Sequence, residues 1–199
     1  MLGLATLSAL LLSVSTALAT PVTVDTKGVD HRYHDLLKLE WKVKGFDFHS
    51  SYIFTTPAHQ NSWGYVNFNV TSIARPEYTA VCSATSNVLS DFFFGTMVFQ
   101  CQVPATAPAN STLGFKYSRP TGELDIIETG SFKPEGPHGK TDCKRPLFTA
   151  TGTKNLTLSC TDTTTVNQNW TMGQIYSDRE VKCAKVDAKV RPTQIVPLA

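Results

Sequence analysis

The sequence predicts an all-β fold, an antiparallel β-barrel or sandwich that is braced by disulfide bonds. Apolar and polar residues alternate with a period of two in several short runs. This pattern is typical of half-buried strands, because successive side chains of a strand point to opposite faces of the sheet. Twelve Gly and 11 Pro favour many turns between these runs. The five cysteines all follow an apparent export signal, and an oxidising compartment would pair them.

The chain is expected to begin with a secretory signal peptide, so the protein is expected to be extracellular. Residues 1–19 carry no charge and end in Ala17-Leu18-Ala19, the small-x-small pattern of a cleavage site. The apolar part is shorter than the ~20 residues that a membrane span needs, which disfavours a retained anchor, and no later segment is apolar enough to cross a bilayer. The predicted organisation is a signal peptide over 1–19, an N-terminal arm over 20–35, a β-barrel domain over 36–190 and a flexible tail over 191–199.

The first predicted strand runs over 37–43, where Leu37, Leu39, Trp41 and Val43 alternate with charged residues. The apolar phase shifts by one residue after Gly45, which predicts a β-bulge. Further alternating runs predict strands over 66–70, 97–101, 113–117, 124–126 and 156–160, and a last strand that starts at Val181.

The charge of the chain argues against nucleic acid as a partner. Its 18 Lys and Arg nearly balance its 16 Asp and Glu, which leaves a formal net charge of +2.

Asn-x-Ser/Thr sequences mark expected glycosylation sites at Asn69, Asn110, Asn155 and Asn169.

The cysteines are expected to form two intramolecular bonds and to leave one residue over. The spacing favours Cys82–Cys101 and Cys143–Cys160, with Cys183 free or bonded to a second chain. A bond from Cys183 to Cys160 or to Cys143 stays open, because the sequence alone does not determine connectivity.

No pattern of catalytic or metal-binding residues stands out, so neither an enzyme nor a cofactor is expected. Glu123, Asp125 and Glu128 could supply a carboxylate pair, but the face that Glu123 and Asp125 share is opposite Leu124 and Ile126 and is expected to be solvated. His31 and His34 lie in the predicted arm, where a metal site is not expected.

Binding is the better expectation, and two aromatic features are its candidate residues. Phe92, Phe93 and Phe94 are consecutive, so they cannot all face one core. They form either the end cap of the barrel or, with Trp63, an exposed apolar contact surface.

Several of these motifs together resemble the major allergen family of Alternaria moulds. The resemblance covers about residues 36–125 and rests on Leu39–Phe46, the Val66–Val70 strand, the pair Cys82 and Cys101, and the hairpin from Phe115 to Ile126. It implies a small secreted fungal β-barrel that acts as an allergen or is perceived by plant hosts, with no settled enzymatic chemistry. It also implies that Cys82 and Cys101 are an intramolecular pair. Some members of the family are disulfide-linked dimers through a Cys near the mature N-terminus, and this chain has none there.

Together these observations predict a secreted, non-enzymatic protein that acts by binding or host recognition, as an effector, elicitor, virulence factor or allergen. Its expected partner is a host protein or a small apolar ligand, and a homodimer through Cys183 is an option. The alternatives are a secreted hydrolase that uses the acidic residues, and a structural glycoprotein of the cell wall.

Overall fold

The computed structural model describes residues 40–73, 75–131 and 147–198. The predicted signal peptide and arm, His31, His34 and Cys143 lie outside these residues. Eleven strands are present within them and no helix, so the predicted all-β fold is confirmed. The strands are β1 (Trp41–Thr56), β2 (His59–Thr71), β3 (Thr79–Ser86), β4 (Phe99–Gln100), β5 (Thr112–Ser118), β6 (Glu123–Ser131), β7 (Leu147–Asn155), β8 (Cys160–Val166), β9 (Ser177–Cys183), β10 (Val186–Val190) and β11 (Gln194–Leu198).

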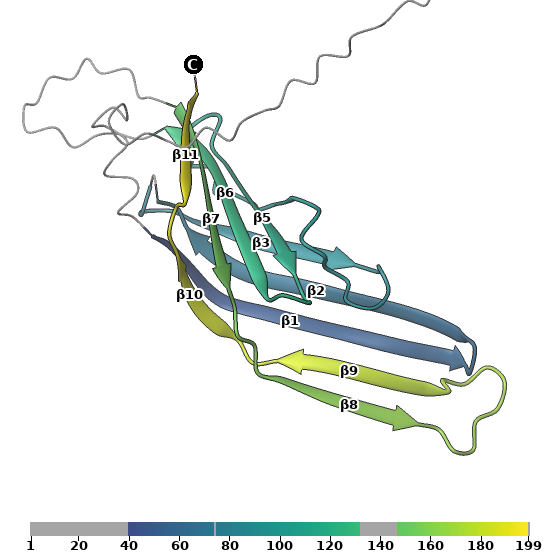
Figure 1. Ribbon diagram of the computed structural model, residues 1–199. Coiled ribbons are helices and arrows are strands. Elements are labelled where there is room, and N and C mark those ends of the chain that lie inside the picture. The colour runs from purple at the N-terminus through teal and green to yellow at the C-terminus, as the bar shows by residue number, and fades with distance from the viewer. Residues whose placement is uncertain (1–39, 74, 132–146, 199) are drawn as a thin grey trace, which may run out of the picture.

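The strands form two antiparallel sheets that face each other as a sandwich and do not close into a barrel (Figure 1). The larger sheet has the order β3-β2-β1-β9-β8, and β10 pairs with the first part of β1. The smaller sheet has the order β11-β7-β6-β5-β4. At one end, β1, β2, β8 and β9 extend beyond the smaller sheet (Figure 1).

The predicted bulge in the first strand is confirmed, and it lets β1 change its partner. Gly45 has φ +63°, a left-handed conformation that glycine adopts without steric cost. The register of β1 with β2 shifts between Lys44 and Asp47. From Trp41 to Phe46, across the bulge, β1 pairs with β10, and from His49 onward it pairs with β9. One long strand therefore connects two parts of the larger sheet.

Several stretches of the chain differ from the sequence-based expectation. The strand predicted over 97–101 shortens to β4, and the strand predicted to start at Val181 starts at Ser177 and is not the last. Residues 156–159 are not a strand, because here the chain crosses from β7 in one sheet to β8 in the other, and their period-two pattern reflects packing of Leu156 and Leu158 against the core. Residues 194–198, expected in a flexible tail, form β11 and pair with β7.

None of the described residues forms a helix long and apolar enough to cross a membrane.

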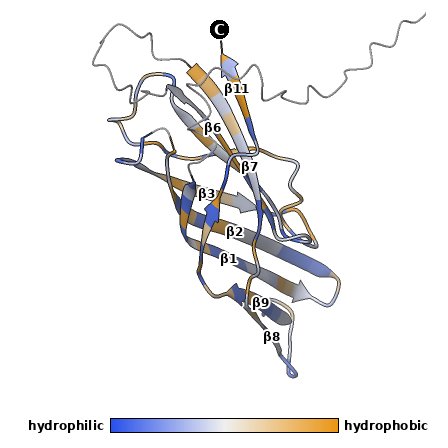
Figure 2. Cartoon of the chain, turned by 60° about the vertical axis from the view of Figure 1, so that its left-hand side comes forward, coloured by the Kyte–Doolittle hydropathy of each residue, from blue (hydrophilic) through white to orange (hydrophobic). Residues whose placement is uncertain are grey.

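The core lies between the sheets and is rich in aromatic rings. Hydrophobic and hydrophilic segments alternate along the strands, as the two-residue period requires (Figure 2). Phe46 and Phe48 of β1 contact Tyr117 of β5, with ring centroids 5.0 Å and 6.2 Å apart, and Phe68 contacts Phe115 at 4.8 Å. Aromatic pairs of this kind therefore connect the two sheets.

Candidate functional site

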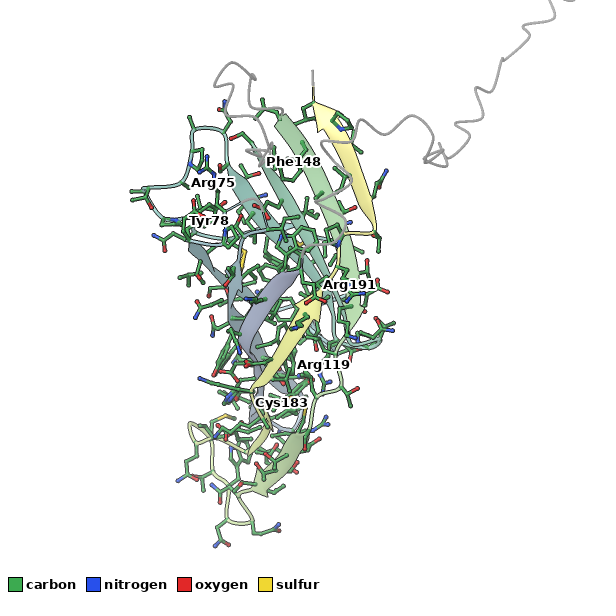
Figure 3. The ribbon with its side chains drawn as sticks, turned by 90° about the vertical axis from the view of Figure 1, so that its left-hand side faces the viewer. Arg75, Tyr78, Arg119, Phe148, Cys183 and Arg191 are labelled. Atoms are coloured by element: carbon green, nitrogen blue, oxygen red, sulfur yellow. A yellow bond between two sulfur atoms is a disulfide. The ribbon has the colours of Figure 1, made fainter. Side chains whose placement is uncertain are left out.

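A polar cavity of about 470 Å³ lies at the end of the sandwich where the larger sheet extends beyond the smaller one. Its wall combines three strands of the larger sheet with two loops. The lining residues are Ser50 and Tyr52 of β1, Cys160 and Asp162 of β8, Arg179 and Val181 of β9, Ser90 and Asp91 of the loop after β3, and Arg119 of the β5–β6 turn. Figure 3 shows Arg119 and Cys183 near this end, away from Arg75, Tyr78 and Phe148 at the other.

Arg119 carries a positive charge that no described carboxylate neutralises within 4.0 Å. Its guanidinium lies over the ring of Phe48, 4.7 Å from the centroid, and Nη2 donates a long hydrogen bond of 3.8 Å to Cys160 Sγ. The backbone N–H of Arg119 donates to the carbonyl of Phe93 at 2.8 Å. The side chain is thus held in place by a ring and a sulfur atom, while most of its five N–H donors keep unused capacity.

Two buried hydroxyls near Arg119 also lack a hydrogen bond of good geometry. Ser50 is 1% exposed and lines the cavity, and its Oγ has no hydrogen bond. The Tyr117 hydroxyl is also buried; the Arg119 guanidinium is its polar neighbour, although no hydrogen bond of good geometry joins them. Burial raises the pKa of Tyr117 to about 12, and the charge of Arg119 opposes that rise. Buried polar groups in proteins are nearly always hydrogen-bonded, so the unpaired hydroxyl of Ser50 is unusual.

The loop after β3 holds Asp91 at the cavity in a strained conformation. Ser90 has φ +82° and Phe92 has φ +65°, although neither is glycine. Each such residue costs on the order of 1–3 kcal/mol, and such strain clusters at sites that clamp ligands. The loop is fixed by the buried ring of Phe92 and by a 2.7 Å hydrogen bond from Tyr52 Oη to the carbonyl of Ser90.

The remaining charged pair of the wall is already neutralised. Arg179 Nε donates to both carboxylate oxygens of Asp162, at 2.9 and 3.1 Å, and its guanidinium lies 5.1 Å from the ring centroid of Tyr52. The hydrogen bonds from Arg179 hold the pKa of Asp162 below its usual value. Arg179 and Asp162 therefore neutralise each other at one side of the cavity.

The prediction that Phe92, Phe93 and Phe94 form one exposed surface is wrong for two of the three rings. Phe92 and Phe93 are 3% and 2% exposed and belong to the core, so a partner cannot reach them. Phe94 is 45% exposed. The alternative of an end cap describes Phe92 and Phe93 better, since they close the sandwich beside the cavity.

Trp63 lies apart from the cavity, on the outer face of the larger sheet, and is 43% exposed. Its ring is nearly parallel to those of His49 and Tyr65, at 5.5 and 5.9 Å between centroids. These three side chains form an outer aromatic cluster on β1 and β2.

The three carboxylates considered for hydrolysis do not meet. Glu123 is exposed, and Asp125 accepts a 2.7 Å hydrogen bond from Thr153 Oγ1. Glu128 is 0% exposed and shares the core face of β6 with Leu124 and Ile126, opposite the face of Glu123 and Asp125. Its oxygens accept hydrogen bonds from the Trp41 indole N–H at 2.6 Å and from the Ser72 hydroxyl. Glu128 thereby links β6 to the start of β1.

The cysteine pairing is partly different from the favoured one. Cys82 is bonded to Cys101, and Cys160 is bonded to Cys183. The favoured bond between Cys143 and Cys160 is therefore wrong, and Cys183 is neither free nor available for a second chain. Register explains the observed bond, since Cys160 and Cys183 are direct partners of the β8–β9 pair.

All four asparagines of the predicted glycosylation sites are exposed: Asn69, Asn110, Asn155 and Asn169.

No group of three or more His, Cys, Asp or Glu side chains in the described ranges could hold a metal ion.

Sequence reasoning did not identify Ser50, Asp91 or Arg119 as site residues. Each is an ordinary polar residue in its local context, and they come together only when the sheets pack. The sequence feature that pointed to this loop was the run of three Phe directly after Asp91. It predicted an exposed apolar surface there and not a polar cavity.

Comparison with known proteins gives one match. The family model described as Alternaria alternata allergen 1 matches residues 43–183, most of the described sandwich. No curated protein matches the chain. No solved structure matches it either.

Proposed function

Because the chain belongs to the Alternaria alternata allergen 1 family, we propose that it is a secreted, allergen-like protein that acts by binding and not by catalysis. Export is supported by the two disulfides and by the exposure of all four asparagines in the glycosylation sequences. A binding role is favoured over hydrolysis because Glu128 is directed into the core while Glu123 is exposed to solvent.

The observation that carries this proposal is the unused hydrogen-bonding capacity around the cavity. Arg119 has no carboxylate partner in the described structure, and the buried hydroxyl of Ser50 has no partner at all there. Leaving a buried hydroxyl such as that of Ser50 unpaired costs about 1–3 kcal/mol, and the half-buried Arg119 leaves its charge open to a partner in the cavity. A small polar ligand would satisfy them, so the cavity favours a polar ligand over the apolar one expected from the sequence.

The test is ligand binding to the mature, disulfide-bonded protein. Saturation-transfer NMR against mixtures of amino acids, organic acids and sugars should find binders, and Arg119→Met should abolish their signals. Lys154→Met is the matched control, because Lys154 is exposed and forms no ion pair within the described residues. Equal signals in both variants, or no binder in any mixture, would refute the proposal.

Host recognition, as an elicitor or virulence factor, is a second candidate function and would use the outer aromatic cluster. Trp63 keeps 43% of its surface exposed, and a Trp of this kind is a frequent anchor of protein interfaces. A host extracellular protein captured by the wild type and by Arg119→Met should be lost with Trp63→Ala. Retention by Trp63→Ala would exclude this cluster as the contact.

A further inference from the structure

We propose that the ligand of the cavity is a small zwitterion of the α-amino-acid type, with its carboxylate on Arg119 and its ammonium group on Asp91. This inference rests on the proposed function and specifies the chemical class of the ligand. It is carried by two opposite, unpaired charges that face one cavity.

Arg119 suits a carboxylate for geometric reasons. A guanidinium is planar and presents its N–H groups as a fork that matches the two oxygens of a carboxylate. The Phe48 ring and Cys160 Sγ hold the plane in position, and neither supplies an oxygen acceptor. A carboxylate would therefore meet a preorganised receptor.

Asp91 supplies the opposite charge. Within the described ranges, no Lys, Arg or His nitrogen lies within 4.0 Å of its carboxylate, and its side chain forms no hydrogen bond there. The strained backbone on both sides and the anchoring of Phe92 in the core hold the carboxylate at the cavity wall. An ammonium group is the simplest partner that neutralises it.

The charge of the whole wall selects a ligand without net charge. Arg119 and Arg179 balance Asp91 and Asp162, and the Arg179–Asp162 pair is satisfied internally. Since Arg119 and Asp91 do not pair with each other, a simple anion would neutralise Arg119 and leave Asp91 unpaired. A zwitterion neutralises both.

Ser50 adds a contact that ordinary surface charges lack. It is 1% exposed, its hydroxyl has no partner in the described structure, and it lines the same cavity from β1. A buried hydroxyl can donate to a carboxylate oxygen or accept from an ammonium group. Because the hydroxyl is closed off from solvent, a ligand contacts it only after a neighbouring side chain moves.

The experiment is calorimetric titration of the mature, disulfide-bonded protein with the twenty standard L-amino acids. The deaminated acid and the decarboxylated amine of the tightest binder are titrated next, together with glucose as a neutral polyol. We expect the amino acid to bind roughly tenfold to a hundredfold more tightly than either analogue, because each analogue leaves one charge unpaired.

Two charge deletions assign the contacts. Arg119→Met should remove the preference for the amino acid over its amine, and Asp91→Asn should remove the preference over its deaminated acid. Lys154→Met and Glu123→Gln, both at exposed positions, should preserve both preferences. Urea unfolding of all four variants verifies that they are folded.

The outcomes separate this inference from the proposed function. One outcome is that glucose or the deaminated acid binds as tightly as any amino acid and that Arg119→Met abolishes this binding. In that case the cavity does bind a ligand, but the proposal that the ligand is a zwitterion is wrong. If none of these probes binds, both proposals fail.

Discussion

Tyr117 shows at the level of one residue how the cavity end of the core is built for something other than stability. Its ring contacts Phe46, Phe48 and Phe93, and it is 1% exposed. Its hydroxyl nevertheless forms no hydrogen bond of acceptable geometry in the described structure. A phenylalanine would fill the same space without an unpaired polar atom. What the hydroxyl has is the neighbouring guanidinium of Arg119, whose interaction with it opposes the rise in its pKa.

The raised pKa of Tyr117 predicts a loss of stability at alkaline pH. In the folded protein its pKa rises from the usual 10.0 to about 12, mainly because burial disfavours the phenolate. The stabilising effect is complete below pH 10 and is lost as the pH rises through 12, by about 2–3 kcal/mol. Urea unfolding between pH 8 and 12 should show this loss, and Tyr117→Phe should flatten the curve in that window. An identical decline in both proteins would contradict this assignment.

Among the secondary-structure elements, β2 and the loop after β3 fit together only because residue 64 of β2 is a glycine. A Cβ at Gly64 would lie 2.8 Å from Cγ of Phe92, closer than real contacts allow. The absent side chain on β2 thus makes room for the ring that anchors the strained loop. The loop is also tied to the other sheet, because Arg119 N donates to Phe93 O and Gly95 N donates to Tyr117 O. The position of Asp91 follows from these contacts.

Gly64→Ala should therefore affect both stability and binding. The added methyl group displaces Phe92, which should reduce the free energy of unfolding by about 1–3 kcal/mol. Since the displaced ring shifts Asp91, amino-acid affinity should fall as well. Urea unfolding and calorimetry measure the two effects, with the exposed neighbour Asn61→Ala as the control. Adding Phe92→Leu should recover part of the loss, and additive losses would show that the two sites do not contact each other.

For the whole molecule, the two disulfides lie at different edges of the larger sheet, so we expect their removal to affect ligand binding differently. Cys82 lies on β3 and Cys160 on β8, at opposite edges of the larger sheet. The Cys82–Cys101 bond fastens β3 to the segment that follows β4 of the smaller sheet. The Cys160–Cys183 bond joins two adjacent strands, and Cys160 also lines the cavity.

Replacing each bond by a pair of serines should cost similar stability but should change binding in only one case. The bonds span 19 and 23 residues, so each constrains the unfolded chain by a similar amount, about 3 kcal/mol. Only Cys160→Ser/Cys183→Ser should weaken amino-acid binding, because Arg119 loses its contact with Sγ. Urea unfolding and calorimetry on both double variants test this. Weaker binding in Cys82→Ser/Cys101→Ser alone would place the site elsewhere.

Local pattern predicted much of this architecture, because strand periodicity is a short-range property. The alternation around Trp41 and Val43 and that of Val66 to Val70 predicted which side chains face the core, and the phase shift predicted the bulge at Gly45. The same rule places Glu128 on the core face of Leu124 and Ile126. The Trp41 indole, 87 residues away in the chain, and the Ser72 hydroxyl show how its carboxylate is accommodated there.

Tertiary packing decided the features that depend on sheet order. The pairing of Cys160 with Cys183 follows from the register of β8 with β9, and β11 forms because the chain returns alongside β7. The cavity brings together Ser50, Asp91 and Arg119 from a strand, a loop and a turn that are distant in the sequence. Periodicity carries no information about such long-range neighbours, because it reports which face a residue occupies and not which other strand lies opposite. The unpaired charges that define the proposed ligand exist only once both sheets have packed.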